Sequence, residues 1–246
     1  STEFGLYLVN YHAKEPTIAA DLAGYKGIDM AALTSMLSSV AGSQAAVLAN
    51  GLATVDVMGN IQAHRRYAED IRMYGFSFNT TLGNASVFGE LAYRPNLPIG
   101  IAATNDLIGD LANGAGAAAG GQFINVGGQM VNLDSQINNA ERVEAFNTSV
   151  GSIYNFGPGL SFDSLFGVFE LASEHLRGSS LKYQAYDGST RYYAGSGNTS
   201  YVSGGDRDDQ VNRDSYSYTV MFNGTWNDVY AGVNLSPYVV YKDDFK

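Results

Sequence analysis

Hydrophobic and polar residues alternate along seven segments of this chain, each about ten to fifteen residues long. In the clearest of them, Tyr216, Tyr218 and Val220 are separated by serine and threonine. A period of two is the pattern of a β-strand with one apolar and one polar face. The pattern predicts strands over residues 3–12, 70–82, 85–94, 142–156, 160–174, 215–226 and 229–241.

The connections between these segments alternate between very short and very long. Gly, Asn, Asp and Pro form tight turns at 83–84, 157–159 and 227–228, whereas 13–69, 96–141 and 175–213 are long loops. Such long loops are uncommon in compact soluble domains, but outer-membrane barrels carry them on one rim. A tilted strand crosses the hydrocarbon in about 9–11 residues. The fold class predicted is therefore all-β, an antiparallel transmembrane β-barrel forming a single domain over residues 1–246.

Seven strands place the first strand's start and the last strand's end on opposite sides of a membrane. Bacterial single-chain barrels normally have an even number of strands and both termini inside. We therefore expect this chain to be a segment of a longer barrel, or the count to be wrong by one. Pro95 and Pro98 are expected to end the third strand, because proline cannot donate to a strand ladder.

The first long loop contains a helical pattern. Asp29 is a suitable N-cap, Gly42 a suitable end, and Gly51 weakens a second apolar stretch. This predicts a helical insert at about 28–66, which either gates the pore or packs against neighbouring loops. The residues at helical spacing, and hence the gating candidates, are Met30, Leu33, Met36, Leu37 and Val40.

The second long loop contains a run of glycine and alanine at residues 114–121. A low-complexity stretch of this kind predicts a flexible extracellular tip. It does not match a nucleotide-binding loop, because the required lysine and hydroxyl residue do not follow.

Composition excludes several classes of function. The chain has no cysteine, which removes disulfides and thiolate sites, and its net charge of −10 argues against nucleic-acid binding. It has no unbroken apolar run of about 18 residues, so no membrane-spanning helix is predicted. A β-barrel would escape that test, because only one face of each strand is apolar.

No constellation of catalytic or metal-binding residues stands out. His12, His64 and His175 are dispersed and lack metal-ligand spacing. No nucleophile elbow or cofactor fingerprint is present, so we predict neither an enzyme nor a cofactor. The only calcium candidates are clustered acids without the EF-hand glycine and glutamate, for which a solvated acidic loop is the favoured interpretation: Asp206, Asp208, Asp209 and Asp214.

Charged residues inside the predicted strands indicate which face is the lumen. Glu90, Arg94 and Glu170 alternate with the apolar stripe. A basic group at the bilayer midplane costs roughly 2–4 kcal/mol, so these side chains should face the lumen or a rim. There they either set selectivity or merely pair and fill the interior. Tyrosines near strand ends suit an interfacial aromatic girdle: Tyr11, Tyr74, Tyr93, Tyr154, Tyr216 and Tyr241.

Two segments, FGLYLVNYHAKEP at 4–16 and YAEDIRMYGFSFNTTLGNASVFGELAYRPNLPIGI at 67–101, carry a more specific signal. They resemble the proteobacterial outer-membrane family filed as domain of unknown function 1302, whose pattern includes NYH, a PEDI strand and SYRPN. Ala68 stands where that family has proline, and Lys242 where it usually has histidine. The resemblance implies a β-barrel in a Gram-negative outer membrane, with an outer-membrane lipoprotein partner and a setting of apolar-compound metabolism.

Three functions remain open at this point. The first is a porin-like channel or transporter in the outer membrane, surrounded by lipid and lipopolysaccharide. It would pass a small solute, and the setting of the family implies an apolar one. The second is a scaffold, adhesin or assembly partner that acts through its long loops. The third is a secreted soluble β-sandwich.

Overall fold

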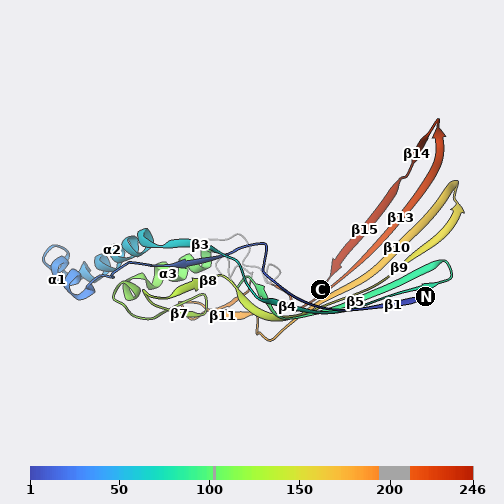
Figure 1. Cartoon of the computed structure of the whole chain (residues 1–246). Coiled ribbons are helices and arrows are strands. Elements are labelled where there is room, and N and C mark those ends of the chain that lie inside the picture. The colour runs from blue at the N-terminus through green and yellow to red at the C-terminus, as the bar shows by residue number, and fades with distance from the viewer. Residues whose placement is uncertain (102–103, 194–210, 246) are drawn as a thin grey trace.

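The computed structural model describes residues 1–101, 104–193 and 211–245, and its largest feature is one long antiparallel sheet (Figure 1). Within these ranges, β1 pairs only with β4, and β15 only with β13, so the sheet has two open edges and forms no closed barrel. Its order is β1 (Thr2–Tyr11), β4 (Ile71–Leu82), β5 (Ala85–Ile99), β9 (Glu141–Gly159), β10 (Phe162–Arg177) and β13 (Asp214–Tyr230), followed along β13 by β14 (Val233–Leu235) and β15 (Tyr238–Phe245).

The first six predicted strands are confirmed, with different ends for several of them, but the predicted seventh strand at 229–241 is wrong, because this stretch is divided between the end of β13, β14 and β15. β5 continues past Pro95 and Pro98 to Ile99, because a register shift between Arg94 and Leu97 accommodates the missing donors. The glycines at 157–159 belong to β9, and the turn is made instead by residues 160–161, which both have positive φ. β13 likewise runs through the predicted turn at 227–228.

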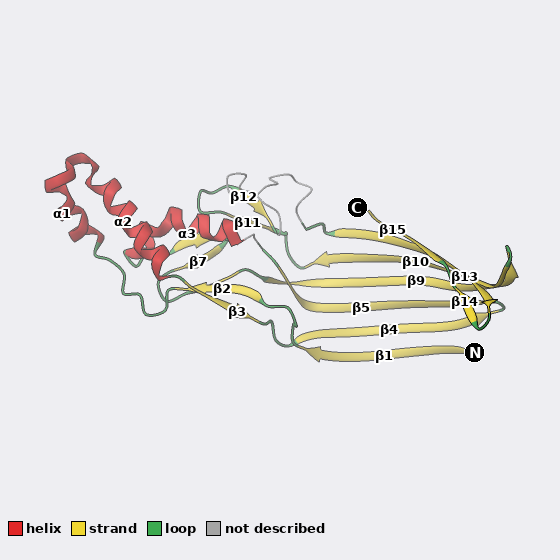
Figure 2. Ribbon diagram, turned by 90° about the horizontal axis from the view of Figure 1, so that it is seen from above, coloured by secondary structure: helices red, strands yellow, loops and turns green. Residues whose placement is uncertain are grey.

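The three long loops build an ordered second part, which we call the loop assembly: residues 13–69, the described residues of 100–140, and 178–193. It lies beyond one end of the sheet (Figures 1 and 2). Its elements are β2 (Thr17–Asp21), α1 (Met30–Ala41), η1 (Gly42–Gln44), α2 (Ala45–Asn60), β3 (Gln62–Arg66), α3 (Thr104–Ala119), β6 (Ile124–Val126), β7 (Gln129–Val131), β8 (Gln136–Asn138), β11 (Lys182–Gln184) and β12 (Thr190–Tyr192).

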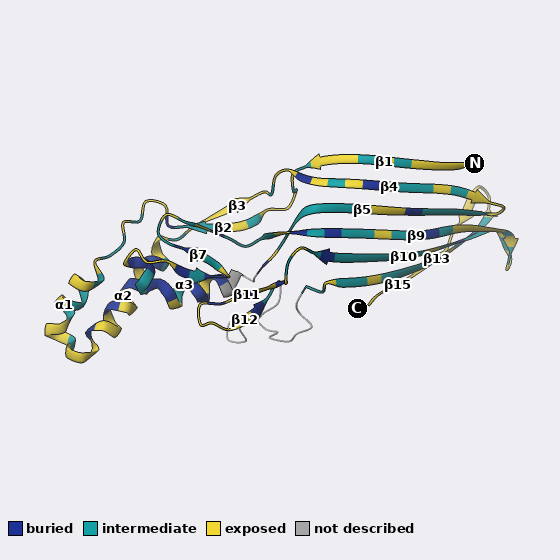
Figure 3. Ribbon diagram, turned by 90° about the horizontal axis from the view of Figure 1, so that it is seen from below, coloured by how far each residue is buried: buried dark blue, intermediate teal, exposed yellow. Residues whose placement is uncertain are grey.

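The hydrophobic core lies in the loop assembly and at the sheet end that adjoins it. Val57, Leu111, Val126 and Ile137 are buried there against one another and against their neighbours. The sheet itself is covered on neither face along most of its length, as the exposed and half-buried colouring of Figure 3 shows. The strands therefore depend on their own backbone ladders, and only the loop assembly has a conventional core.

The helical insert begins where predicted, and it is more continuous than predicted after that. The Asp29 carboxylate caps α1 by accepting from the backbone N–H groups of Ala31 and Ala32. Gly42, with φ 53°, ends α1, while α2 continues across Gly51 without interruption. By length and composition alone, the stretch Met30–Asn60 is apolar enough to cross a membrane, contrary to the expectation, but η1 divides it into two shorter helices.

The glycine and alanine run at 114–121 is not a flexible tip, because most of it is the C-terminal half of α3. A Cβ on Gly114 would lie 2.7 Å from the Ile124 side chain, and one on Gly116 would lie 2.0 Å from the Asn50 side-chain oxygen. The missing side chains let α3 approach β6 and α2 closely. The low-complexity run thus encodes tight packing.

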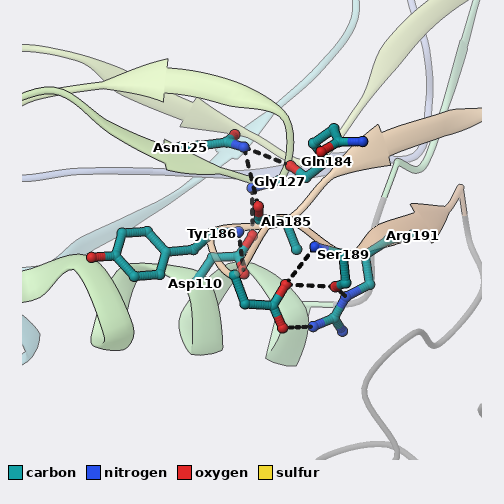
Figure 4. Close-up of polar contacts among 9 residues, drawn as sticks. Asp110, Asn125, Gly127, Gln184, Ala185, Tyr186, Ser189 and Arg191 are labelled. Carbon is teal, nitrogen blue, oxygen red and sulfur yellow. Dashed lines mark hydrogen bonds and ion pairs between the residues drawn. The ribbon is translucent and has the colours of Figure 1, made fainter.

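A buried carboxylate joins α3 to two turns of the loop assembly (Figure 4). Asp110 is only 5% exposed, and it accepts from the N–H of Gly127 at 2.9 Å and from the N–H of Tyr186 at 3.2 Å. Nearby, the Ser189 hydroxyl holds the pKa of Asp187 below its usual value by donating to that carboxylate. These bonds fix where β6, β7, β11 and β12 sit against the helix.

Replacing Asp110 with alanine should loosen this junction. Two backbone N–H groups would lose a buried acceptor, which costs about 2 kcal/mol or more. Hydrogen exchange at the amides of Gly127 and Tyr186 should then accelerate at least about tenfold. The exposed Asp134→Ala is the control and should leave both rates unchanged. If the two amides exchange as slowly in the Asp110 variant as in the unchanged protein, Asp110 does not hold the junction.

Candidate functional site: the two faces of the sheet

Strand register assigns each side chain of the sheet to one of two faces, because directly paired residues share a face and neighbours along a strand alternate. Leu6, Phe76 and Leu91 are paired in one row across β1, β4 and β5. All three are exposed, Leu6 to 84%. We call this side the apolar face; it also carries Phe4, Leu8, Phe78, Val87, Val150, Phe169, Leu171, Val220, Phe222 and Val239.

Aromatic rings border the apolar face at both ends. Near the loop assembly, Tyr93 stacks on Tyr74 and on Phe146, with ring centroids 6.2 and 4.6 Å apart. Near the tight turns, Phe156 contacts Tyr154 at 4.7 Å and Phe222 at 6.3 Å. Tyr74, Tyr93 and Tyr154 belong to these rows, and their interfacial role stays a prediction.

The separation of the two aromatic rows can be counted along β9. Phe146 and Tyr154 are eight residues apart on the same face, which corresponds to about 27 Å along the strand, or about 20 Å in height at a tilt of about 40°. Outer-membrane barrels have an apolar band of roughly 25 Å.

Asp243, on the edge strand β15, is a charged exception on the apolar face. Tyr11 is a correction, because its register places it with Tyr7 on the opposite face.

The opposite side, which we call the polar face, is hollowed by a cavity of about 520 Å³. Its lining includes Glu90, Arg94, Ser149, Glu174, Lys242 and Asp244. Around the cavity, serine, asparagine and charged side chains thus replace the apolar stripe, whereas Ile153, Val168, Met221 and Val240 form an apolar row on the same side nearer the tight turns. Such a cavity lining holds water and ions rather than hydrocarbon.

Several contacts order the side chains of the polar face. The Tyr7 hydroxyl donates to the Glu90 carboxylate across two strands. Arg94 donates to the side-chain oxygen of Asn147 at 2.5 Å, and Lys242 lies 3.2 Å from Asp244. The charges are therefore held at fixed places along the cavity.

The predicted lumen residues share this polar face. Glu90 and Arg94 line the cavity, and Glu170 belongs to the same face through its pairing with Gly151 and Thr219. Their role in selectivity stays a prediction. Sequence reasoning missed other members of the face, Tyr7, Glu174, Lys242 and Asp244, of which Glu174 follows the same alternation as Glu170.

The other sequence candidates that the structure describes lie away from the polar face. The gating candidates are in α1, which packs mainly against α2 and, through Met30, against the core of the loop assembly, at the end of the molecule farthest from the sheet (Figure 1). Of the calcium candidates, 206, 208 and 209 lie outside the described residues. Asp214 pairs with His175 at 2.6 Å and with Arg177 at 2.7 Å. The described part of the chain contains no group of acids and histidines suited to a metal ion.

Comparison with known proteins gives one match. Residues 1–246 match the model of a family described as protein of unknown function, DUF1302. The resemblance stated from the sequence is thereby confirmed. No curated protein and no solved structure matches the chain.

The close approach of Tyr7 to Gly75 provides a test of how the polar face is built. A Cβ on Gly75 would lie 1.8 Å from the Tyr7 ring, so Gly75→Val should displace the ring and break its bond to Glu90. We expect a loss of about 1–3 kcal/mol in unfolding free energy, measured by denaturant titration. Gly159→Val is the matched control, because a Cβ on this strand residue meets nothing within 4 Å.

A double variant makes the cause specific. Tyr7→Ala combined with Gly75→Val removes the ring with which the new side chain collides, so the two effects should not add. Full additivity would show that the ring and the glycine are not coupled.

Proposed function

Because the chain belongs to the DUF1302 family of proteins of unknown function, its activity has to be argued from its own geometry, and we propose that it forms the wall of an outer-membrane β-barrel channel. The observation that carries this proposal is the exposed apolar face between two aromatic rows. The polar face on the other side of the same strands then lines the lumen. Long loops at one end and tight turns at the other support the same arrangement.

The extent of the exposed apolar face favours a lipid surrounding. Soluble monomers rarely expose a contiguous apolar patch larger than a few hundred Å². Here the exposed apolar side chains extend over all the long strands, from Leu6 on β1 to Val239 on β15. Hydrocarbon would cover the apolar side chains of this face without a penalty, Asp243 on the edge strand being a charged exception, and tyrosine at its borders would keep its hydroxyl in the hydrated interface.

The two open sheet edges require partners in this environment. Unpaired backbone groups of β1 and β15 would each cost several kcal/mol in hydrocarbon, which only a closed sheet avoids. We propose that further strands pair with these edges and complete the barrel. The described strands are then one part of its wall.

The solute that fits the polar face is small and hydrated. The face carries the carboxylates Glu90, Glu170, Glu174 and Asp244, against the cations Arg94 and Lys242. An excess of fixed negative charge favours the passage of cations. This lining does not favour the apolar solute that the family resemblance implies.

The scaffold alternative has one observation in its favour, the ordered loop assembly with its own core. Solute uptake by liposomes that contain the protein separates the two functions. Swelling or conductance supports a channel, and silence towards every solute supports a scaffold. Passage that appears only after deletion of residues 28–60 would assign a gating role to the helical insert.

Lipid contact by the apolar face can be measured directly. The chain has no cysteine, so Leu6→Cys on β1 can carry a single fluorescent probe. In bilayers with brominated acyl chains this probe should be quenched at least about twofold, whereas a probe at Ser149→Cys on the polar face should respond to aqueous iodide. Recovery of a monodisperse protein without detergent would refute the membrane assignment.

Charge reversal at Glu174 tests the lumen assignment. Glu174→Lys changes the fixed charge beside the cavity by two units, so the cation-to-anion permeability ratio should fall about fivefold or more, as measured from reversal potentials. Asp134→Lys, in the loop assembly, is the control and should leave the ratio nearly unchanged. The opposite ranking of the two variants would place the ion path elsewhere.

A further inference from the structure

The helical hairpin formed by α1, η1 and α2 is the most exposed apolar element outside the sheet. It projects at the end of the molecule opposite the sheet (Figures 1 and 2). From Met30 to Val55 it contains no charged residue on any side. Its large apolar side chains are exposed: Met36, Val40, Val47, Leu48, Leu52 and Val55, with Val40 at 87% and Val47 at 67%.

The packing of α2 is inverted relative to a helix of a soluble protein. Its buried positions are Ala45, Ala49, Ala53 and Val57, a stripe of mostly small residues at spacing four, of which Ala53 and Val57 belong to the core that α2 shares with α3. The larger leucines and valines point outward instead. Small residues between helices and large ones outside are the arrangement of helices packed in lipid, where burying apolar volume between helices brings no advantage.

Four hydroxyl groups of the hairpin donate to carbonyls within it. The hydroxyls of Thr34 and Thr54 donate to the carbonyls of Met30 and Asn50, four residues earlier, at 2.7 and 2.9 Å. Ser38 and Ser39 bond in the same way to carbonyls three residues earlier. Such bonds lower the cost of moving a hydroxyl out of water.

Charged groups appear only at the base of the hairpin. Lys26 and Asp29 precede it, and Asp56 accepts from the Tyr25 hydroxyl at 2.6 Å. From this base to the turn, the uncharged part of each helix is about 16–18 Å long. This equals roughly one leaflet of a bilayer, about 15 Å of hydrocarbon, and falls short of two.

We propose that the tip of this hairpin inserts into one leaflet of a lipid bilayer, with Lys26, Asp29 and Asp56 at its surface. The absence of charge on all sides decides between occupants. A protein partner or a second copy would cover one face and leave a polar face in water, whereas hydrocarbon would surround every side of the tip that projects beyond α3. The proposed function places the sheet in one bilayer, so the hairpin, at the opposite end of the molecule, would enter a second one. That part of the proposal rests on the proposed function.

The test uses the protein in nanodiscs and vesicles of phosphatidylcholine and phosphatidylglycerol with brominated acyl chains. A probe at Val47→Cys should gain about twofold or more in intensity on entering a bilayer and then be quenched by the bromine. Met130→Cys is the matched control, because Met130 is equally apolar and 63% exposed but lies on β7. Its probe should not respond to vesicles.

A charge at the tip should prevent insertion without unfolding the helices. Val40→Lys adds a charge at the most exposed apolar position and should lower vesicle partitioning about tenfold or more. Met130→Lys should leave partitioning unchanged. Circular dichroism verifies that both variants keep their helices.

Two outcomes would overturn the proposal. The Val47 probe could remain unresponsive to vesicles, or it could change without them in proportion to protein concentration, which identifies a second copy as the occupant. Bromine placed only in the nanodisc lipid reports on the sheet through the Leu6→Cys probe. A failure of the membrane assignment for the sheet is therefore distinguishable from a failure of the hairpin proposal.

Discussion

The backbone hydrogen-bond ladder between neighbouring strands is the interaction on which the rest of this structure depends. Neither face of the sheet is covered along most of its length, so no layer of packed side chains holds the strands together. Long ladders of backbone hydrogen bonds, such as the one between β9 and β10, hold the strands together instead. Because the ladder alone sets the register, it also decides which residues lie on each face.

The loop assembly is built on a different principle, the close approach of small residues. Gly114 and Gly116 bring α3 against β6 and α2, and the Asp110 carboxylate binds two turns to the same helix. A buried carboxylate has to be satisfied by donors, and here two backbone N–H groups supply them. The molecule thus combines a sheet without a core and a loop assembly with one.

Much of the fold could be predicted from local patterns. Alternation located the long strands, and Asp29 with Gly42 marked the start and end of α1, because strand faces and helix caps are set by nearby residues. The strand ends were less predictable. Pro95 and Pro98 end a strand in isolation, but a bulge and the neighbouring β9 carry β5 past them. The glycine and alanine run read as a flexible tip, since nothing local shows which elements pack against it.

The sequence by itself determined that Glu90 and Arg94 share a face of one strand, and that Glu170 lies opposite the apolar stripe of another, because side chains alternate along a strand. It also determined the charge-free stretch that follows Asp29. Only the tertiary structure decided which distant residues meet on that face, such as Tyr7 with Glu90, and that α1 lies far from the sheet. The physical reason is that strand pairing and helix packing join segments tens of residues apart, and no local pattern encodes their register or direction.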